Sequence, residues 1–145
     1  MSKIAERLIE AVKCGDISTR DELQDCKIKL CGELGLKNVP PNSEILAEVA
    51  DDDRELILPL LIKKPMRTAS GTAVVAVMAS PHPCPHGKCT FCPGGVENGS
   101  PQSYTGKEPA ARRAGRNLYD PYMQVTDRIH QLEVIGHDAS KIDLI

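Results

Sequence analysis

Hydrophobic residues recur at every third or fourth position through the first part of the chain, a spacing that predicts amphipathic helices. The first helix covers residues 2–14 and should end at Gly15, because glycine is favoured just past the end of a helix. The next begins after Thr19, which can form a capping box with Glu22. A short helix follows, and Pro59 then interrupts an apolar stretch, so the helix there should bend or stop. This part is therefore predicted to be an all-helical layer.

The pattern changes at residue 72, where eight uncharged residues follow one another. Residues 72–79 are rich in β-branched side chains, which predicts a central parallel strand covered on both faces. A loop rich in proline and glycine runs from residue 80 to about residue 103. The last residues, 141–145, predict a second buried strand.

Two helices are expected between these strands. A second capping box, formed by Thr105 and Glu108, should introduce the first of them, with Pro109 in its first turn. The predicted fold class is α/β, in which a helical layer over residues 1–70 precedes a β-α-β unit over residues 71–145. Two strands cannot close a barrel, which takes about 250 residues. The chain is therefore expected to hold only the start of a larger parallel fold.

Three cysteines lie within nine residues of the loop that follows the first strand: Cys84, Cys89 and Cys92. Three thiolates on one short loop suit an iron–sulfur cluster that keeps one iron without a protein ligand, because a closed site would normally show four ligands. Loops that leave the carboxyl ends of parallel strands are also where such folds bind their ligands. The sequence therefore predicts a metal cluster at this loop.

Two other interpretations of these cysteines stay open. A zinc ion could be held if His82 or His86 completed a three-sulfur site, although both histidines are expected to hydrogen-bond backbone carbonyls of the loop. A redox pair of Cys89 and Cys92 is less favoured, because a third thiol lies beside it. The other three cysteines do not converge in sequence and are expected to be small buried apolar residues: Cys14, Cys26 and Cys31.

Composition and charge limit the possible partners. The 145 residues suffice for one sizeable core, and the net charge of -2 gives no general attraction to polyanions. A nucleic-acid surface would therefore have to be local, and two short basic groups are candidates: Lys63, Lys64 and Arg67, and Arg112, Arg113 and Arg116. The N-terminus has no secretory pattern, and no apolar run reaches the roughly 18 residues that span a membrane. We expect no membrane partner, a cytoplasmic location and reduced thiols.

The residues around the thiols resemble a known family. The three cysteines, with the aromatic residue Phe91 just before the last of them, are similar to the cluster loop of radical S-adenosylmethionine enzymes. The flanking motifs resemble the catalytic subunit of Elongator: Arg-Thr-Ala-Ser-Gly at 67–71, Val-Val-Ala-Val-Met at 74–78, Pro-His-Pro-Cys-Pro-His at 81–86, Cys-Pro-Gly-Gly at 92–95 and Gln-Ser-Tyr-Thr-Gly-Lys-Glu-Pro at 102–109. The resemblance is strong from about residue 55 and weaker before it. The cysteines are separated by four and two residues, a spacing that resembles archaeal or bacterial members acting as a single polypeptide.

This resemblance implies a tRNA wobble-uridine acetyltransferase that makes 5-carboxymethyluridine from acetyl-CoA. It implies that Cys84, Cys89 and Cys92 bind a 4Fe-4S cluster, that the free iron binds S-adenosylmethionine, and that Lys141 contributes to acetyl-CoA binding. It also implies the start of a radical S-adenosylmethionine TIM-like barrel, incomplete in this chain. No residue of the chain is assigned as catalytic.

The same resemblance implies tRNA as the partner, contacted by the helices of residues 1–70 and by the arginines near residue 112. A C-terminal acetyltransferase-like domain would lie beyond this chain, so the fragment alone is expected to be inactive, and a homodimer stays open. The alternative from another class is a zinc-stabilised nucleic-acid-binding module without catalysis.

Overall fold

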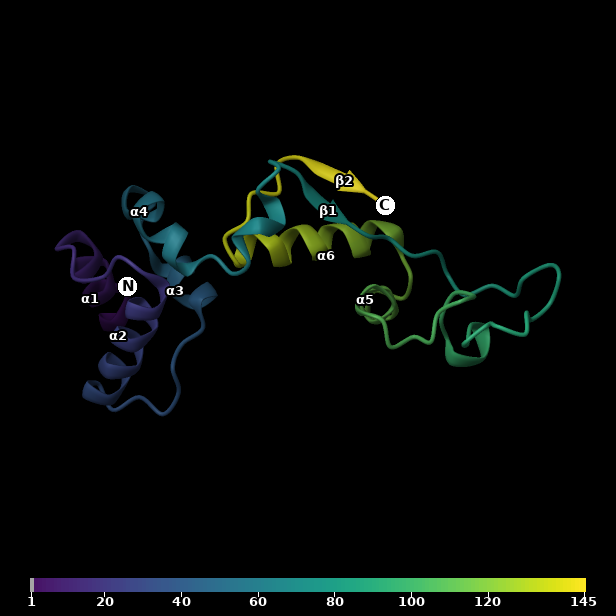
Figure 1. Cartoon of the computed structure of the whole chain (residues 1–145), viewed down its shortest axis with the longest axis horizontal. Coiled ribbons are helices and arrows are strands. Elements are labelled where there is room, and N and C mark those ends of the chain that lie inside the picture. The colour runs from purple at the N-terminus through teal and green to yellow at the C-terminus, as the bar shows by residue number, and fades with distance from the viewer. Residues whose placement is uncertain (1) are drawn as a thin grey trace. The chain divides into compact units, whose positions relative to one another are not determined.

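The computed structural model describes residues 2–145. Its elements follow in the order α1 (Lys3–Lys13), α2 (Arg20–Glu33), α3 (Asn42–Glu48), α4 (Asp51–Leu61), β1 (Ala73–Val75), α5 (Pro109–Arg116), α6 (Pro121–Val134) and β2 (Ile142–Leu144), as labelled in Figure 1. Two short 3-10 helices lie at Pro65–Thr68 and Val96–Asn98. Within this described part, no helix has the length and apolar character needed to cross a membrane.

The described residues form two compact units. The first contains the residues up to Gly71 together with Leu132–Asp138, and the second contains Thr72–Gln131 and Ala139–Ile145. The first unit is helical, because α1 to α4 pack around one apolar core. Its largest fully buried side chains are those of Leu8, Leu23, Ile45, Leu46, Ile57 and Leu61. Leu8, Leu23, Ile45 and Leu46 are among the recurring apolar positions from which the helices were predicted.

The helix ends in this unit are satisfied locally. The backbone N–H groups of Ser18 and Thr19 donate to Glu22 Oε2 at 2.8 and 2.9 Å, and they lower the pKa of Glu22 to about 2. The predicted capping box at the start of α2 is therefore confirmed. Gly15, with φ of 81°, follows the last turn of α1, as expected for a residue just past a helix end.

The helical unit differs from expectation at two places, in that helix α4 does not stop at Pro59 and not all of the cysteines outside the loop are buried. Helix α4 continues through Pro59 to Leu61, although proline removes one helix hydrogen bond. The turn persists because Ile57 and Leu61, each 1% exposed, bury the helix on either side of Pro59. The cysteines differ from one another as well, since Cys14 is exposed and Cys26 is half-buried. Cys14 caps the end of α1, beyond the buried stripe.

In the second unit, β1 and β2 pair in parallel, with Ala73 opposite Ile142 and Val75 opposite Leu144. The parallel β-α-β order is as predicted, but the expected burial of both strands is wrong. Along β1 only alternate residues are buried, and Val74 is 50% exposed. All three residues of β2 are exposed. A sheet of two strands leaves both of its edges, and much of its surface, without covering elements.

Helix α6 supports the chain that leaves β1. The side-chain amide of Gln124 accepts from Met78 N at 2.9 Å and donates to Met78 O at 3.0 Å. Both bonds are buried, and they satisfy the backbone polar groups that follow the strand. The predicted second capping box is wrong, because Glu108 is itself the residue before α5. Thr105 N and Oγ1 donate to Glu108 Oε1 at 2.9 and 2.8 Å, and the backbone bond is the main reason that the pKa of Glu108 is lowered.

A substitution at Gly136 can test how tightly residues Leu132–Asp138 pack in the first unit. It has φ of 91°, and a Cβ there would lie 2.7 Å from Leu58 Cδ1 and 3.2 Å from Leu46 Cδ1. We expect Gly136→Ala to lower the free energy of unfolding by about 2–4 kcal/mol, through backbone strain and overpacking. Gly35→Ala is the matched control, because Gly35 has φ of 66° with open space around it. Equal losses for both variants in denaturant unfolding would show that only the backbone matters.

Candidate functional site

The chain between β1 and α5 carries the three clustered cysteines, and we call residues 80–105 the thiol loop. Polar interactions order this loop. Ser100, which is fully buried, donates to Gly95 O at 3.3 Å and to Tyr104 O at 2.8 Å. Tyr119 Oη donates to Gly99 O at 2.6 Å, which attaches the loop to the segment that follows α5. The loop therefore keeps a defined shape although it contains little regular structure.

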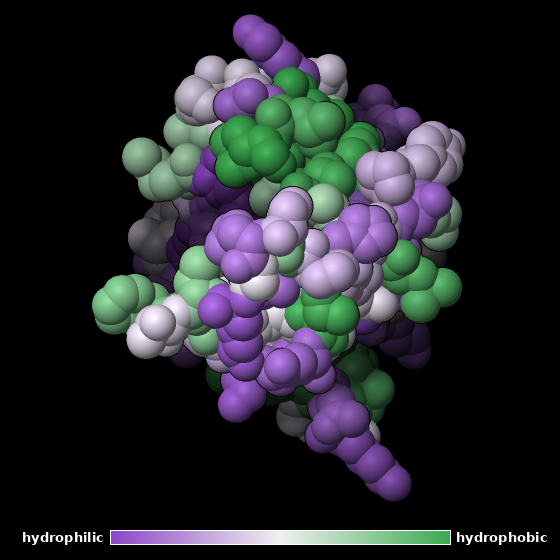
Figure 2. Space-filling view, turned by 90° about the vertical axis from the view of Figure 1, so that its right-hand side faces the viewer, coloured by the Kyte–Doolittle hydropathy of each residue, from purple (hydrophilic) through white to green (hydrophobic). Residues whose placement is uncertain are grey.

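The structure brings all three thiols of the loop to one cavity. This cavity of about 240 Å³ is lined by Cys84, Cys89, Cys92, His86, Phe91 and Gln102, among others. The Phe91 side chain is 94% exposed, so the cavity lies at the surface. Figure 2 shows hydrophilic and hydrophobic side chains intermixed on the face that it presents. The three cysteines of the loop therefore line one shared cavity.

Two of the three sulfur atoms have hydrogen-bond partners. Cys92 Sγ donates to Gly94 O at 2.6 Å and to Gln102 Oε1 at 3.2 Å. Cys89 Sγ lies 3.1 Å from His86 Nε2. The expectation that His86 bonds a backbone carbonyl is therefore wrong, because its ring faces a thiol. His82 does not line this cavity.

The three thiols are not gathered around a single point. Among residues 2–145, no three His, Cys, Asp or Glu side chains stand close enough to hold one metal ion together. A zinc site needs its sulfur ligands about 2.3 Å from the same ion. A cluster spreads its irons over several corners, so its thiolates can surround it without touching one another. Three free thiols line one cavity here, and thiolate is the ligand type that such clusters use.

One charged pair lies beside the cysteines. Lys88 Nζ lies 2.7 Å from Glu97 Oε2, and this hydrogen bond raises the pKa of Lys88 and lowers the pKa of Glu97. Both groups are exposed, so their attraction is weak. They line a second cavity of about 250 Å³, which Cys84 and Gln102 also line.

Lys141 lies apart from the cysteines. It directly precedes β2, is exposed, and its carbonyl oxygen accepts from Ala73 N at 2.8 Å. The parallel register therefore places Lys141 at the amino end of the strand pair, whereas the thiol loop leaves the carboxyl end of β1. The structure does not bring these predicted site residues together.

The basic group on α5 lines a hollow of its own. Arg112, Arg113 and Arg116 surround a space of about 290 Å³ together with Pro109 and with Gln131 of α6. Among residues 2–145, none of the three arginines forms an ion pair with a carboxylate. Gln131 accepts from the Arg128 guanidinium at 3.3 Å and donates to Asp127 Oδ2 at 2.7 Å. Arg128, which was not among the predicted basic residues, thus adjoins this basic hollow through Gln131.

The second basic group is less gathered. Lys63 and Lys64 line a hollow of about 340 Å³ with Arg20, while Arg67 lies outside it. Arg20 also donates to the Pro59 carbonyl oxygen at 2.9 Å.

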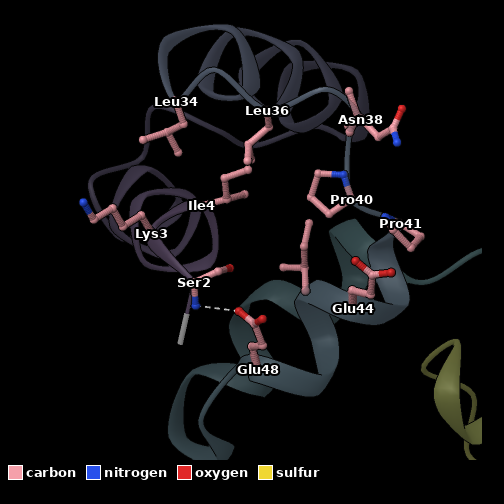
Figure 3. A pocket seen from close by; sticks show the side chains of 12 residues that line it. Ser2, Lys3, Ile4, Leu34, Leu36, Asn38, Pro40, Pro41, Glu44 and Glu48 are labelled. Atoms are coloured by element: carbon pink, nitrogen blue, oxygen red, sulfur yellow. Dashed lines mark hydrogen bonds between the residues drawn. The ribbon is translucent and has the colours of Figure 1, made fainter.

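A further hollow is a groove in the helical unit that the sequence did not predict. It has a volume of about 770 Å³ and lies between α1, the segment after α2, and α3, as Figure 3 shows. Leu36 and Val39 expose apolar surface to it, at 49% and 40% exposure. At its edge, Ser2 N donates to Glu48 Oε2 at 2.6 Å.

Comparison with known proteins finds relatives of the whole chain. The family model of the ELP3 N-terminal domain matches residues 1–69. The tRNA uridine(34) acetyltransferase of Methanocaldococcus infernus is 45% identical over 150 residues, which cover 100% of this chain and 28% of that protein. Elongator complex protein 3 of Homo sapiens is 43% identical over 151 residues, which cover 98% of this chain and 27% of that protein.

These matches define a class of proteins named for tRNA acetylation or for the Elongator complex. Residues 1–69 match the ELP3 N-terminal domain, and the whole chain aligns with the N-terminal part of these relatives, in agreement with the resemblance that its motifs indicated. It spans 28% of the length of the archaeal relative. The helices before residue 55, where the resemblance is weaker, are included in the family-model match.

Proposed function

We propose that the chain is the N-terminal part of a tRNA uridine(34) acetyltransferase that makes 5-carboxymethyluridine by radical S-adenosylmethionine chemistry. One observation carries this proposal: in a chain of this family, three free thiols from a single loop line one cavity. The proposed acyl-transfer activity and tRNA substrate are supported by the names of two relatives, which are called tRNA uridine(34) acetyltransferases. Free thiols throughout the chain favour a cytoplasmic location.

Cys84, Cys89 and Cys92 would hold the cluster, and no fourth protein ligand is needed. When bound, a 4Fe-4S cluster with one open iron would supply the electron that cleaves S-adenosylmethionine. The residues of this chain provide the surroundings, in which Lys88 and Glu97 form an ion pair beside the cysteines. The hydrogen bonds of Ser100 keep the loop in shape.

The incomplete cover of the sheet supports a larger barrel. Val74, Ile142 and Leu144 expose apolar side chains on a pair of strands, at 50%, 36% and 59%. Further parallel strands and helices would bury these side chains, as in a TIM-like barrel. We propose that such strands, and an acetyltransferase-like domain, are supplied by a longer protein.

Metal content separates the enzyme from the zinc-module alternative. Anaerobic reconstitution of the full-length protein, of which this chain is proposed to be a part, should give a brown product with about four irons per chain. Cys89→Ala should lose this cluster, because a thiolate ligand is removed, whereas Cys14→Ser, which changes an exposed thiol outside the loop, should keep it. One tightly bound zinc per chain and no iron uptake would instead favour the structural module.

The arginine hollow is proposed to contact tRNA phosphates. Replacing Arg112, Arg113 and Arg116 together with Glu should weaken tRNA binding for all sequences and reduce the salt dependence of the affinity. The measurement is a binding titration of the natural protein at several salt concentrations, and iron content is expected to stay normal. Unchanged affinity at low salt would show that the three arginines form an ordinary solvated surface.

Lys141 is proposed to pair with a phosphate of acetyl-CoA. Lys141→Ala should cost about 1–3 kcal/mol of acetyl-CoA affinity, because a charge-assisted hydrogen bond is lost. Cluster assembly and tRNA binding should be preserved, whereas Cys92→Ala should abolish cleavage of S-adenosylmethionine. The check is tRNA-dependent acetyl-CoA hydrolysis over a range of acetyl-CoA concentrations, with Lys3→Ala as an exposed control. A wild-type concentration dependence in Lys141→Ala would remove this lysine from the site.

A further inference from the structure

Gln102 occupies a central position in the thiol loop that its sequence did not reveal. It lines both the cavity shared by the three thiols and the second cavity beside Lys88 and Glu97. Its Oε1 atom accepts from Cys92 Sγ at 3.2 Å. Gln102 opens the Gln-Ser-Tyr-Thr-Gly-Lys-Glu-Pro motif, to which the proposed function assigns no role.

Gly95 provides the space in which the Gln102 carboxamide lies. It has φ of 133°, and a Cβ there would lie within 2.8 Å of Gln102 Cδ and closer still to Oε1. Any larger residue would push the carboxamide away from the sulfur. The contact is therefore formed from two sides, by a glycine that makes room and by a side chain that fills it.

The two partners of Cys92 are not equivalent once the sulfur binds iron. A bound thiolate has no proton to donate, so it can only accept a hydrogen bond. Gly94 O, the other partner, is a carbonyl and cannot donate. Gln102 can, because a half-turn of its side-chain amide exchanges Oε1 for the Nε2–H group within the same volume.

We propose that Gln102 is a positioning residue of the cluster site, which holds Cys92 towards the shared cavity and donates an N–H group to its thiolate. This inference rests on the proposed function for its second part, since it assumes a cluster. Hydrogen bonds to ligand sulfurs are among the features that set the reduction potential of an iron–sulfur cluster. Gln102 thereby raises the potential of the cluster.

The first test measures the potential. Gln102→Glu keeps the shape of the side chain but replaces the donor with a negative acceptor, so it should lower the one-electron midpoint potential of the reconstituted natural protein. We expect a tenfold shift of the reduction equilibrium, which corresponds to about 59 mV for one electron. The control Gln24→Glu makes the same chemical change at an exposed position of α2 and should leave the potential unchanged. A Gln102→Glu potential equal to that of wild type overturns the donor role.

The second test needs no metal. In the metal-free protein, Gln102→Ala should raise the alkylation rate of Cys92 about threefold, because the sulfur loses a covering partner. The rate at Cys84, mapped in the same digest by mass spectrometry, should stay constant as an internal control. An unchanged Cys92 rate overturns the positioning role. A wild-type protein that binds no iron would overturn the proposed function and the donor role, while the alkylation rates would still decide whether Gln102 holds Cys92.

Discussion

Parallel pairing of β1 with β2 is the constraint on which the second unit depends. Two parallel strands cannot be joined by a tight turn, so the chain between them needs a long crossover. Here that crossover contains the thiol loop, α5 and α6. The pairing sends the thiol loop out at the carboxyl end of β1 and places Lys141 at the opposite end of the strands. The Gln124 carboxamide continues the hydrogen bonding beyond β1 at Met78, where the pairing with β2 has ended.

The thiol loop obtains its order from polar contacts instead of from a core. Buried hydroxyl and amide groups satisfy its backbone carbonyls, and glycines allow close approach where a Cβ would collide. Such an arrangement suits a site that must present several sulfur atoms to one cavity and leave it accessible. It also makes the chemistry sensitive to single side chains, since each contact has few neighbours that could replace it.

Local patterns predicted most of the helical unit. Hydrophobic spacing located α1 to α3, and the Thr19–Glu22 pair identified the start of α2, because capping depends on residues only three positions apart. The helix does not stop at Pro59, and the second capping box was predicted wrongly. At Pro59, burial of the surrounding helix outweighs the loss of one hydrogen bond, and at Thr105 the loop places Glu108 as the residue before the helix.

The sequence by itself indicated the family and placed three thiols on one short segment, because the number, type and spacing of the cysteines are properties of that segment. Only the tertiary structure decided that their sulfur atoms share a cavity, and that Gln102 and His86 are the groups beside them. It likewise decided that the α5 arginines surround a hollow with Gln131. These contacts depend on how the loop returns on itself and how two helices pack, and neither is encoded in the spacing of residues along the chain.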